Sequence, residues 1–332
     1  MIELSGENLP LARCEVMSCM EALGCPGSIV HSQGKVLVID SKAKAGDLVR
    51  RLGLARGIYR VLGEGEGTVY GIKRLVRDAD IPPGRTRVTA LRSSREGVGP
   101  SLAQDLAGAV GATLSRSNPI DLKNPELTLT VAVGRPTALG VQLGEVDRLG
   151  MRSRMVKHRP FFSPVSIEPK YARALINLSR CPDDGRLLDP FAGTGGIPME
   201  AGIMGMGSAG ADLQQEMVEG ARMNLDHFKV SGCQMYQGDF QDVWESQGPF
   251  HTVATDPPYG RSSTGGGEDI LTLYERFFNV AADHLPPGRF MSTIMPSNME
   301  AEPWPDRFQL IDDHSLRVHR SLKRRFLSFK RI

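Results

Sequence analysis

The sequence predicts an α/β protein, and two observations support that prediction. Stretches typical of strands and of helices alternate along most of the 332 residues, a pattern typical of parallel sheets covered by helices. Several short strands in the second half end in acidic residues or turns, where a doubly wound sheet binds its ligands. The chain is long enough for two or three compact domains, each with its own core.

Composition excludes several classes of protein. The formal net charge is +2, so any basic surface that binds nucleic acid must be local. We expect a cytoplasmic protein without membrane contact, because no apolar run approaches the roughly 20 residues of a membrane span and the N-terminus does not resemble a secretory signal. The five cysteines form no C-x-x-C, which favours reduced thiols and no bound metal.

The first half of the chain is expected to hold two small parts and a linker. Residues 1–45 form the first part, and residues 46–139 form an α/β unit punctuated by prolines and glycines. Residues 140–157 are expected to be a linker, where basic residues gather with no acid after Asp147. The expected helices span 11–23, 68–80 and 101–114, and the expected strands span 35–40, 85–91 and 126–134.

Residues 158–332 are expected to form the largest domain. Repeated strand–helix units predict a parallel, doubly wound sheet whose ligand lies at the carboxyl ends of the strands. The expected strands span 186–190, 208–212, 233–239, 250–258 and 289–296, with a terminal hairpin of 308–314 and 324–330. The expected helices span 168–180, 196–205, 214–228 and 271–285.

The segment LLDPFAGTGGIPMEA is the first candidate for a binding loop. A strand brings Asp189 to its carboxyl end, and Gly193 and Gly195 permit a tight turn and close approach of the backbone to a ligand. Dinucleotide-binding enzymes use a related loop, so the glycines alone do not decide between ligands.

Further acids follow the next two strands and narrow the choice of ligand. Asp212 ends one strand, where a carboxylate can accept both hydroxyls of a ribose and would repel a phosphate. Asp239 ends the following strand, where it can accept the amino group of adenine, with Phe240 beside the ring. Each acid alone is equally well explained as a helix cap or a solvated strand end. Together they favour a nucleoside that carries positive charge, and S-adenosylmethionine fits that description.

The segment TDPPYG, residues 255–260, supplies the second half of a site. An exocyclic amine of a base is a poor nucleophile, because its lone pair is delocalised into the ring. Acceptors aimed at its hydrogens, the Asp256 carboxylate and the Pro257 carbonyl, favour attack on a methyl sulfonium. Tyr259 offers a face on which a base can stack, worth roughly 1–3 kcal/mol. The alternative is a plain Pro-Pro turn.

DPPY after a strand, with DPFAGTGG upstream, resembles the amino-methyltransferases of DNA and RNA. HRPFFSPVSIEPKYARALINLSR, GADLQQEMVEGARMNL, TDPPYGRSS and HRSLKRRF narrow the match to the archaeal tRNA guanosine N(2)-methyltransferases that act at position 10. The resemblance begins near residue 46 and is closest after His158. It implies a Rossmann-like class I methyltransferase domain with a seven-stranded, mostly parallel sheet, preceded by a ferredoxin-like part and a THUMP RNA-binding domain at 46–139.

The resemblance also implies roles for individual residues and a partner. The implied partner is tRNA, bound by a monomer, and the need for a small accessory subunit stays open. In the family, the stretch that matches Phe161, Phe162 and Pro164 packs over the cofactor; a linker docked on the core is the alternative. The residues implied to line the S-adenosylmethionine site are Asp189, Phe191, Gly193, Gly195, Asp212, Asp239, Phe240 and Phe162. Those implied to hold the target base are Asp256, Pro257 and Tyr259.

Three basic segments are candidates for contact with RNA phosphates. Charge runs are usually solvated faces, but three of them in a nearly neutral chain favour nucleic acid. The residues concerned are Arg85, Arg87, Arg92, Arg95, Arg152, Arg154, Lys157, Lys323, Arg324 and Arg325.

Other functions are weighed against RNA methylation. A DNA amino-methyltransferase would share DPPY but is expected to carry a sequence-reading DNA domain, which is not evident. Methylation of another guanosine in tRNA or rRNA stays open. An RNA-binding protein without catalysis is disfavoured by the intact Asp189, Asp256 and Tyr259, and a nicotinamide enzyme by the absence of any residue in TDPPYG suited to hydride transfer.

Overall fold

The computed structural model describes every residue except 94–98, 164–165, 260–268, 298, 300–301 and 320–321. The chain folds into two compact units, and the polypeptide passes between them several times. The first unit comprises residues 1–9, 27–49 and 55–146, and the second comprises residues 10–26, 50–54 and 147–332. Within the described residues, no helix is both long and apolar enough to cross a membrane.

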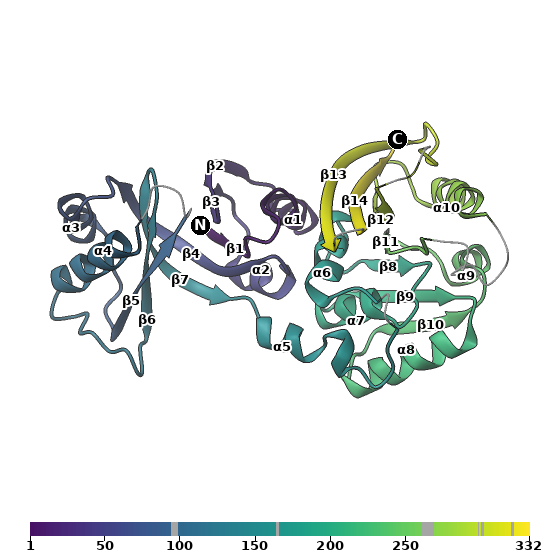
Figure 1. The fold of residues 1–332 in the computed structure, drawn as a ribbon, viewed down its shortest axis with the longest axis horizontal. Coiled ribbons are helices and arrows are strands. Elements are labelled where there is room, and N and C mark those ends of the chain that lie inside the picture. The colour runs from purple at the N-terminus through teal and green to yellow at the C-terminus, as the bar shows by residue number, and fades with distance from the viewer. Residues whose placement is uncertain (94–98, 164–165, 260–268, 298, 300–301, 320–321) are drawn as a thin grey trace. The chain divides into compact units, whose positions relative to one another are not determined.

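The first unit is built on a sheet of seven strands, as far as the structure describes the chain, in the order β2-β3-β1-β4-β7-β6-β5. Helices α3 (Val69–Asp78) and α4 (Pro100–Thr113) pack on one face of it, and their apolar sides form a core with the sheet (Figure 1). The strands are β1 (Ile2–Leu4), β2 (Ser28–Gln33), β3 (Val36–Asp40), β4 (Ala55–Gly65), β5 (Thr86–Arg92), β6 (Leu127–Val133) and β7 (Thr137–Glu145).

This sheet differs from the expected division at residue 45. Strand β1 pairs antiparallel with β4, Ile2 opposite Ile58, so strands from both expected parts share one sheet. The expected linker is also structured, because β7 extends to Glu145 and helix α5 (Arg148–Ser153) follows it. Asp147 caps α5 by accepting a hydrogen bond from the amide of Gly150 at 2.8 Å.

The second unit contains the expected seven-stranded, mostly parallel sheet, counted over the residues that the structure describes. Its order is β10-β9-β8-β11-β12-β14-β13, and the first five strands run parallel. Strand β14 is antiparallel to β12 and to β13, which confirms the expected terminal hairpin. The strands are β8 (Arg186–Asp189), β9 (Gly207–Asp212), β10 (Cys233–Gln237), β11 (Thr252–Thr255), β12 (Phe290–Pro296), β13 (Phe308–His319) and β14 (Leu322–Arg331).

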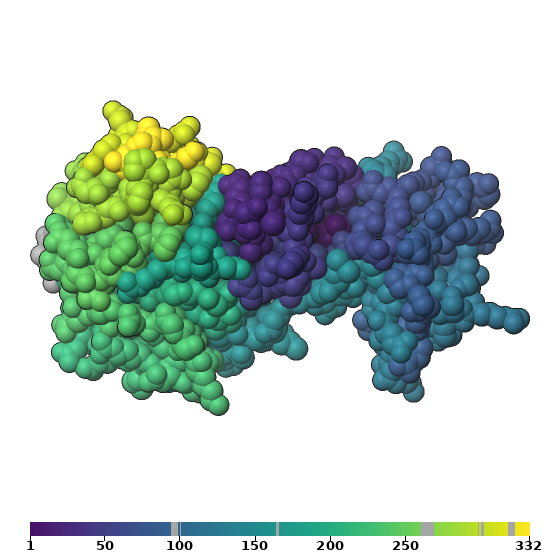
Figure 2. Space-filling model, turned by 180° about the vertical axis from the view of Figure 1, so that it is seen from behind, coloured from purple at the N-terminus to yellow at the C-terminus, as the bar shows by residue number. Residues whose placement is uncertain are grey.

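Helices cover both faces of this second sheet (Figure 1). One face packs against α6 (Pro169–Leu178), α7 (Gly196–Ile203) and α8 (Gln215–His227), and the other packs against α9 (Phe240–Gln247) and α10 (Ile270–His284). Helix α9 was not expected from the sequence. The space-filling view shows the β13–β14 hairpin, in yellow, at the surface of this unit (Figure 2).

Two short N-terminal segments belong to the second unit. Helix α1 (Leu9–Ala22) carries Glu15, which is fully buried and accepts hydrogen bonds from the amides of Gly53 and Leu54 at 2.7 and 2.8 Å. Asn177 of α6 donates to Glu15 and accepts from Arg51, both at 3.1 Å. Because every one of these polar groups is buried, their pairing fixes α1 to α6.

A buried ion triad joins α5, α6 and α7. Glu200 of α7 is fully buried, and its two oxygens accept from Arg154 and Arg173, each at 2.7 Å. This position corrects the expectation that Arg154 contacts RNA phosphates, because its guanidinium is buried and already paired with Glu200. The triad ties the segment before the expected catalytic domain to the helix behind the glycine loop.

We predict that Glu200→Ala destabilises the second unit by about 3–5 kcal/mol, because it leaves two buried guanidinium groups without their anion. Urea unfolding followed by tryptophan fluorescence measures the effect. Glu219→Ala, an exposed position on α8, is the control and should change stability by less than about 0.5 kcal/mol. Equal stability of the two variants would contradict a supporting role for the triad.

Candidate functional site

Four aspartates lie at the carboxyl edge of neighbouring parallel strands in the second unit. Asp189 and Asp212 are the last residues of β8 and β9, and Asp256 directly follows β11. Asp239 follows β10 after one glycine and caps α9 through the amide of Gln241 at 2.9 Å. The strand order brings together the four acids predicted from the sequence, although each has a different environment.

Asp189 is 1% exposed and anchors the glycine loop. Its Oδ1 accepts from the hydroxyl of Thr255 at 2.6 Å and from the amide of Phe191 at 3.3 Å. Burial raises the pKa of Asp189 to about 7, against the opposing effect of these hydrogen bonds. Asp189 therefore connects the ends of β8 and β11 and holds the start of the loop.

The two loop glycines differ in what surrounds them. Gly193 has φ +49°, and a Cβ added there would meet no described atom within 4 Å, so space for a ligand lies beside it. Gly195 has φ +77°, and a Cβ there would lie 2.9 Å from the Cβ of Ala221 in α8. Gly193 therefore borders open space, whereas Gly195 is required by the packing of α7 on α8.

Asp212 faces the same loop. Its Oδ2 accepts from the amide of Gly193 at 3.0 Å and its Oδ1 accepts from the amide of Gln214 at 2.9 Å. Partial burial raises the pKa of Asp212 above its usual range. Each oxygen has accepted one N–H and retains a further lone pair, so the carboxylate can still accept from two hydroxyls.

Asp239 is paired with an arginine that the sequence reading missed. Arg276 of α10 donates to both oxygens of Asp239 at 2.9 Å, and its guanidinium lies 4.4 Å from the ring centroid of Phe240. Partial burial tends to raise the pKa of Asp239, but the hydrogen bonds from Arg276 and the Gln241 amide outweigh it and lower the pKa. Phe240 is 3% exposed and packs in the core, where its ring centroid lies 5.2 Å from that of Phe191.

Asp256 and Tyr259 form a second, partly unsatisfied cluster. Arg324 of β14 donates to Asp256 Oδ2 at 3.4 Å, and its guanidinium lies 5.1 Å from the ring centroid of Tyr259. Asp256 Oδ1 and the Tyr259 hydroxyl are buried and have no hydrogen-bond partner among the described residues. Burial raises the pKa of Asp256 to about 7, and Arg324 opposes that rise. Unpaired buried oxygens of this kind are uncommon and mark a place where a ligand can bind.

A hydrogen bond from helix α10 holds the DPPY turn, and the sequence did not predict the residue that donates it. The hydroxyl of Tyr274 in α10 donates to the carbonyl of Pro258 at 2.7 Å, and the Tyr274 side chain is buried. Tyr274 and Arg276 lie in a stretch whose apolar pattern predicts only a helix, so no local signal distinguishes them. Their roles depend on contacts with residues 16 and 37 positions away.

The two phenylalanines before α6 have different environments. Phe161 exchanges hydrogen bonds with the side chain of Asn224 on α8, and its ring covers Gly220, where a Cβ would clash. Phe162 is 61% exposed. Pro164 lies outside the described residues.

The expected basic residues are not equivalent. Arg92, Arg152, Lys157 and Lys323 are exposed, whereas Arg85 pairs with Glu126 at 3.2 Å and Arg325 with Asp313 at 2.7 Å. Arg87 donates to Thr128 at 3.2 Å. Arg95 lies outside the described residues.

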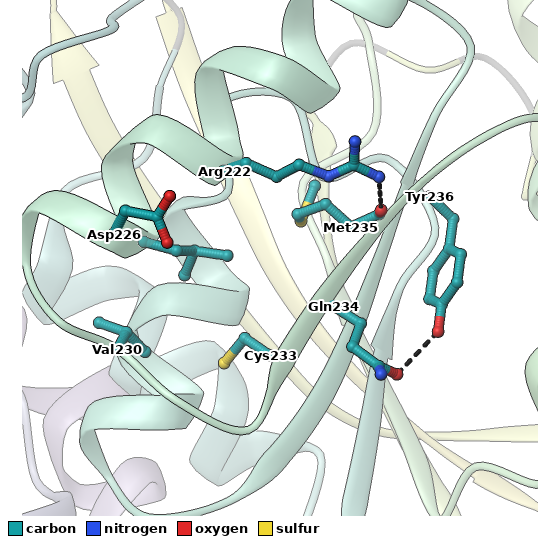
Figure 3. Close-up of a pocket in the computed structure, with 8 residues that line it drawn as sticks. Arg222, Asp226, Val230, Cys233, Gln234, Met235 and Tyr236 are labelled. Carbon is teal, nitrogen blue, oxygen red and sulfur yellow. Dashed lines mark hydrogen bonds between the residues drawn. The ribbon is translucent and has the colours of Figure 1, made fainter.

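A pocket at the β10 edge of the second sheet is separate from the site of the four aspartates. It lies between α8 and β10, and Figure 3 shows Arg222 donating to the carbonyl of Met235 at 2.6 Å and Tyr236 donating to Gln234 at 2.7 Å. In the described sheet β10 is an edge strand, so Arg222 satisfies a carbonyl that no neighbouring strand pairs. Arg222 thus covers part of this edge.

Comparisons with known proteins agree with this arrangement. Residues 157–325 match the family model described as RMKL-like, methyltransferase domain. The chain is 31% identical over 329 residues to the tRNA (guanine(10)-N2)-dimethyltransferase of Methanothermobacter thermautotrophicus, covering 98% of this chain and 97% of that protein. It is also 31% identical over 330 residues to the protein of the same name from Pyrococcus abyssi, with the same coverage.

Solved structures share the fold. The crystal structure of TrmN from Thermus thermophilus matches with a TM-score of 0.56 and 20% identity, covering 100% of this chain and 99% of that one. The structure of SMU.472 complexed with SAH matches with a TM-score of 0.52 and 18% identity, covering 100% and 97%.

The raised pKa of Asp256 predicts a pH-dependent stability difference. Its ordinary value is 3.8 and its folded value about 7, so the folded state holds the proton more tightly and loses stability as pH rises between these values. Asp256→Asn has no titrating group at this position and therefore does not lose this stability as the pH rises. The variant should therefore gain stability relative to the parent by on the order of 1 kcal/mol per pH unit between about pH 4 and 7.

Urea unfolding of the two proteins at matched pH values measures this difference. Asp283→Asn is the control, because Asp283 is an exposed carboxylate paired with Arg307. A stability difference between Asp256→Asn and the parent that does not change with pH would contradict the raised pKa.

Proposed function

The chain belongs to the RMKL-like methyltransferase family, and on that premise we propose that it methylates the 2-amino group of a guanosine in tRNA, with S-adenosylmethionine as methyl donor. The observation that carries the proposal is that Asp256 Oδ1 is buried without a hydrogen-bond partner among the described residues, in a cluster where Arg324 contacts Asp256 and faces the ring of Tyr259. A base stacked on Tyr259 can give its amine an acceptor there. The names of the full-length relatives favour position 10 and two methyl groups.

The residues around the glycine loop fit the methyl donor. We assign close backbone approach to Gly193, because no described atom fills the space beside it. Asp212 retains lone pairs for a ribose diol. Asp239 and Arg276, stacked on Phe240, form a polar group at the next strand end that can contact adenine. Asp189, already bonded to Thr255 and Phe191, would act by holding the loop.

The chain's own residues account for the activation of the amine. Bound S-adenosylmethionine supplies an electrophilic methyl group on a sulfonium. Asp256 accepts a hydrogen of the 2-amino group, which favours a nitrogen lone pair that is no longer delocalised into the ring. We assign the second acceptor to the Pro257 carbonyl, on a turn that Tyr274 holds through Pro258. As the nitrogen accepts the methyl group from the sulfonium, which would leave as a neutral thioether, the nitrogen becomes acidic and its proton passes to Asp256 or to water.

Binding of the RNA is assigned to exposed basic residues and to the first unit. Residues 46–139 are proposed to act as a THUMP domain, and the protein is proposed to act as a monomer. The exposed side chains offered to phosphates are Arg85, Arg92, Arg152, Lys157 and Lys323. Such contacts should weaken steeply with salt, because binding releases condensed counterions.

We predict that Asp256→Asn keeps S-adenosylmethionine affinity and lowers single-turnover methyl transfer at least about a hundredfold, since one acceptor of a charge-developing group is lost. The assay uses labelled S-adenosylmethionine and an unmodified tRNA transcript, followed by nucleoside mass analysis. Asp283→Asn serves as the matched control. Equal loss of affinity and transfer would place Asp256 in the cofactor site instead.

The same assay tests the proposed function itself. N(2)-Methylguanosine or N(2),N(2)-dimethylguanosine is the expected product, and a transcript with adenosine at position 10 should not react. A methylated base other than guanosine, or no product from folded and cofactor-bound protein, would refute the proposal.

Gly193→Ala and Gly195→Ala should separate ligand binding from folding. Gly193→Ala places a methyl group in open space, so it should weaken S-adenosylmethionine binding at least about tenfold with only about 1 kcal/mol of backbone strain. Gly195→Ala should lower thermal stability more, because its methyl group meets Ala221. Calorimetric titration and thermal unfolding measure the two effects, and a reversed order would contradict the assignment.

A further inference from the structure

Arg324 reaches the candidate base site from the strand next to β12. It lies on β14 opposite Pro296 of β12, and β12 lies beside β11, whose end leads to Asp256. Its guanidinium contacts Asp256 and faces the ring of Tyr259. The side chain is 13% exposed, so this basic residue points into the unit rather than toward solvent.

The neighbouring basic residue shows that this orientation is specific. Side chains alternate along a strand, and Arg325 pairs with the exposed carboxylate of Asp313 on the adjacent β13. Arg324 is thus distinguished from the rest of the terminal basic run by both its burial and its partner.

The guanidinium of Arg324 and a target base compete for the same groups. A base that stacks on Tyr259 and donates its amine to Asp256 needs the ring face and the carboxylate that Arg324 now contacts. The guanidinium is planar and donates N–H groups from neighbouring nitrogens. Guanine presents the same pattern, because its N1–H and 2-amino group lie side by side in one plane.

The contact that Arg324 makes is weak enough to be exchanged. It reaches one oxygen of Asp256 at 3.4 Å, whereas Arg276 reaches both oxygens of Asp239 at 2.9 Å. Arg324 Nε, Asp256 Oδ1 and the Tyr259 hydroxyl are buried without hydrogen-bond partners in the part of the chain that the structure describes. A ligand that satisfies more of these atoms can replace the arginine, because an unpaired buried polar atom is costly.

We propose that Arg324 is a placeholder for the target base: its guanidinium occupies the base site in the RNA-free protein, and the base enters by displacing it. The inference rests on the proposed function. An entering base must bind the site more favourably than the guanidinium of Arg324 does, and guanine can do so with its two adjacent donors. Adenine presents an amine beside an acceptor nitrogen, which the carboxylate of Asp256 would repel.

Equilibrium dialysis with labelled guanosine tests the proposal without any RNA phosphate. The parent chain, Arg324→Ala and Arg324→Lys are compared in the presence of S-adenosylhomocysteine. Arg324→Ala should bind guanosine about tenfold more tightly, the order expected when a stacked, hydrogen-bonded cation is removed from the site. Arg324→Lys should show a smaller gain, because lysine lacks the planar fork. Arg307→Ala, which changes a half-buried arginine paired with Asp283, should bind as the parent does.

A second measurement uses the guanidinium ion itself. Millimolar guanidinium chloride should weaken guanosine binding to Arg324→Ala by refilling the cleared site, and should have a smaller effect on the parent. Binding of S-adenosylhomocysteine by each variant shows that its second unit is folded. If Arg324→Ala fails that check, Arg324→Lys carries the comparison.

Two results would overturn the placeholder. Guanosine binding that is unchanged or weaker in Arg324→Ala would make Arg324 a contact for the base or a structural residue. Failure of every variant to bind guanosine would also count against it, since clearing the site should open it. Dialysis requires no turnover, so lack of methyl transfer by the parent refutes the proposed function separately.

Discussion

The concentration of negative charge at one edge of a sheet is the constraint on which the rest of the second unit depends. Parallel strands bring four carboxylates together. Each carboxylate must be stabilised by hydrogen bonds or ion pairs, or its pKa rises. Backbone amides serve Asp212, a hydroxyl and an amide serve Asp189, and a bidentate arginine serves Asp239. Among the described residues Asp256 receives the least, one long contact from Arg324, and it is the carboxylate nearest the proposed chemistry. The arrangement thus keeps three acids satisfied and leaves one available for a substrate.

One helix supports two of these positions. Tyr274 and Arg276 both belong to α10, and they hold the DPPY turn and the acid after β10 respectively. The proposed base site and cofactor site are therefore fixed by the same element, whose apolar side is packed into the core of the sheet. A shift of α10 would move a contact in each site, so this helix couples the geometry of the two sites.

The strands of the second sheet could be predicted from the sequence, but the side chains that pair with its aspartates could not. Apolar runs that end in an acid or a glycine mark β8, β9 and β11 clearly, so Asp189, Asp212 and Asp256 could be placed at one edge. Helix α9 was missed because it has only eight residues and its cap, Asp239, was expected to be the last residue of the preceding strand. Strands β1 and β4 were missed because one has three residues and the other contains several glycines. The pairing of Arg276 with Asp239 and of Arg324 with Asp256 could not be predicted, since only the folded chain brings these arginines to acids 37 and 68 residues away.

The early place of α1 in the chain has a consequence for folding during synthesis. The first sheet is complete once β7 has emerged, but α1 belongs to the unit that ends with β14. Some 300 residues separate α1 from that strand, and at about 5–20 residues per second their synthesis takes roughly 15–60 s. During that time Cys14 lacks the β13 side chains of Asp312 and His314 beside it, and for about the first half of it the carboxylate of Glu15 also lacks Asn177. The contacts of α1 with β13 can therefore form only after nearly the whole chain has been made.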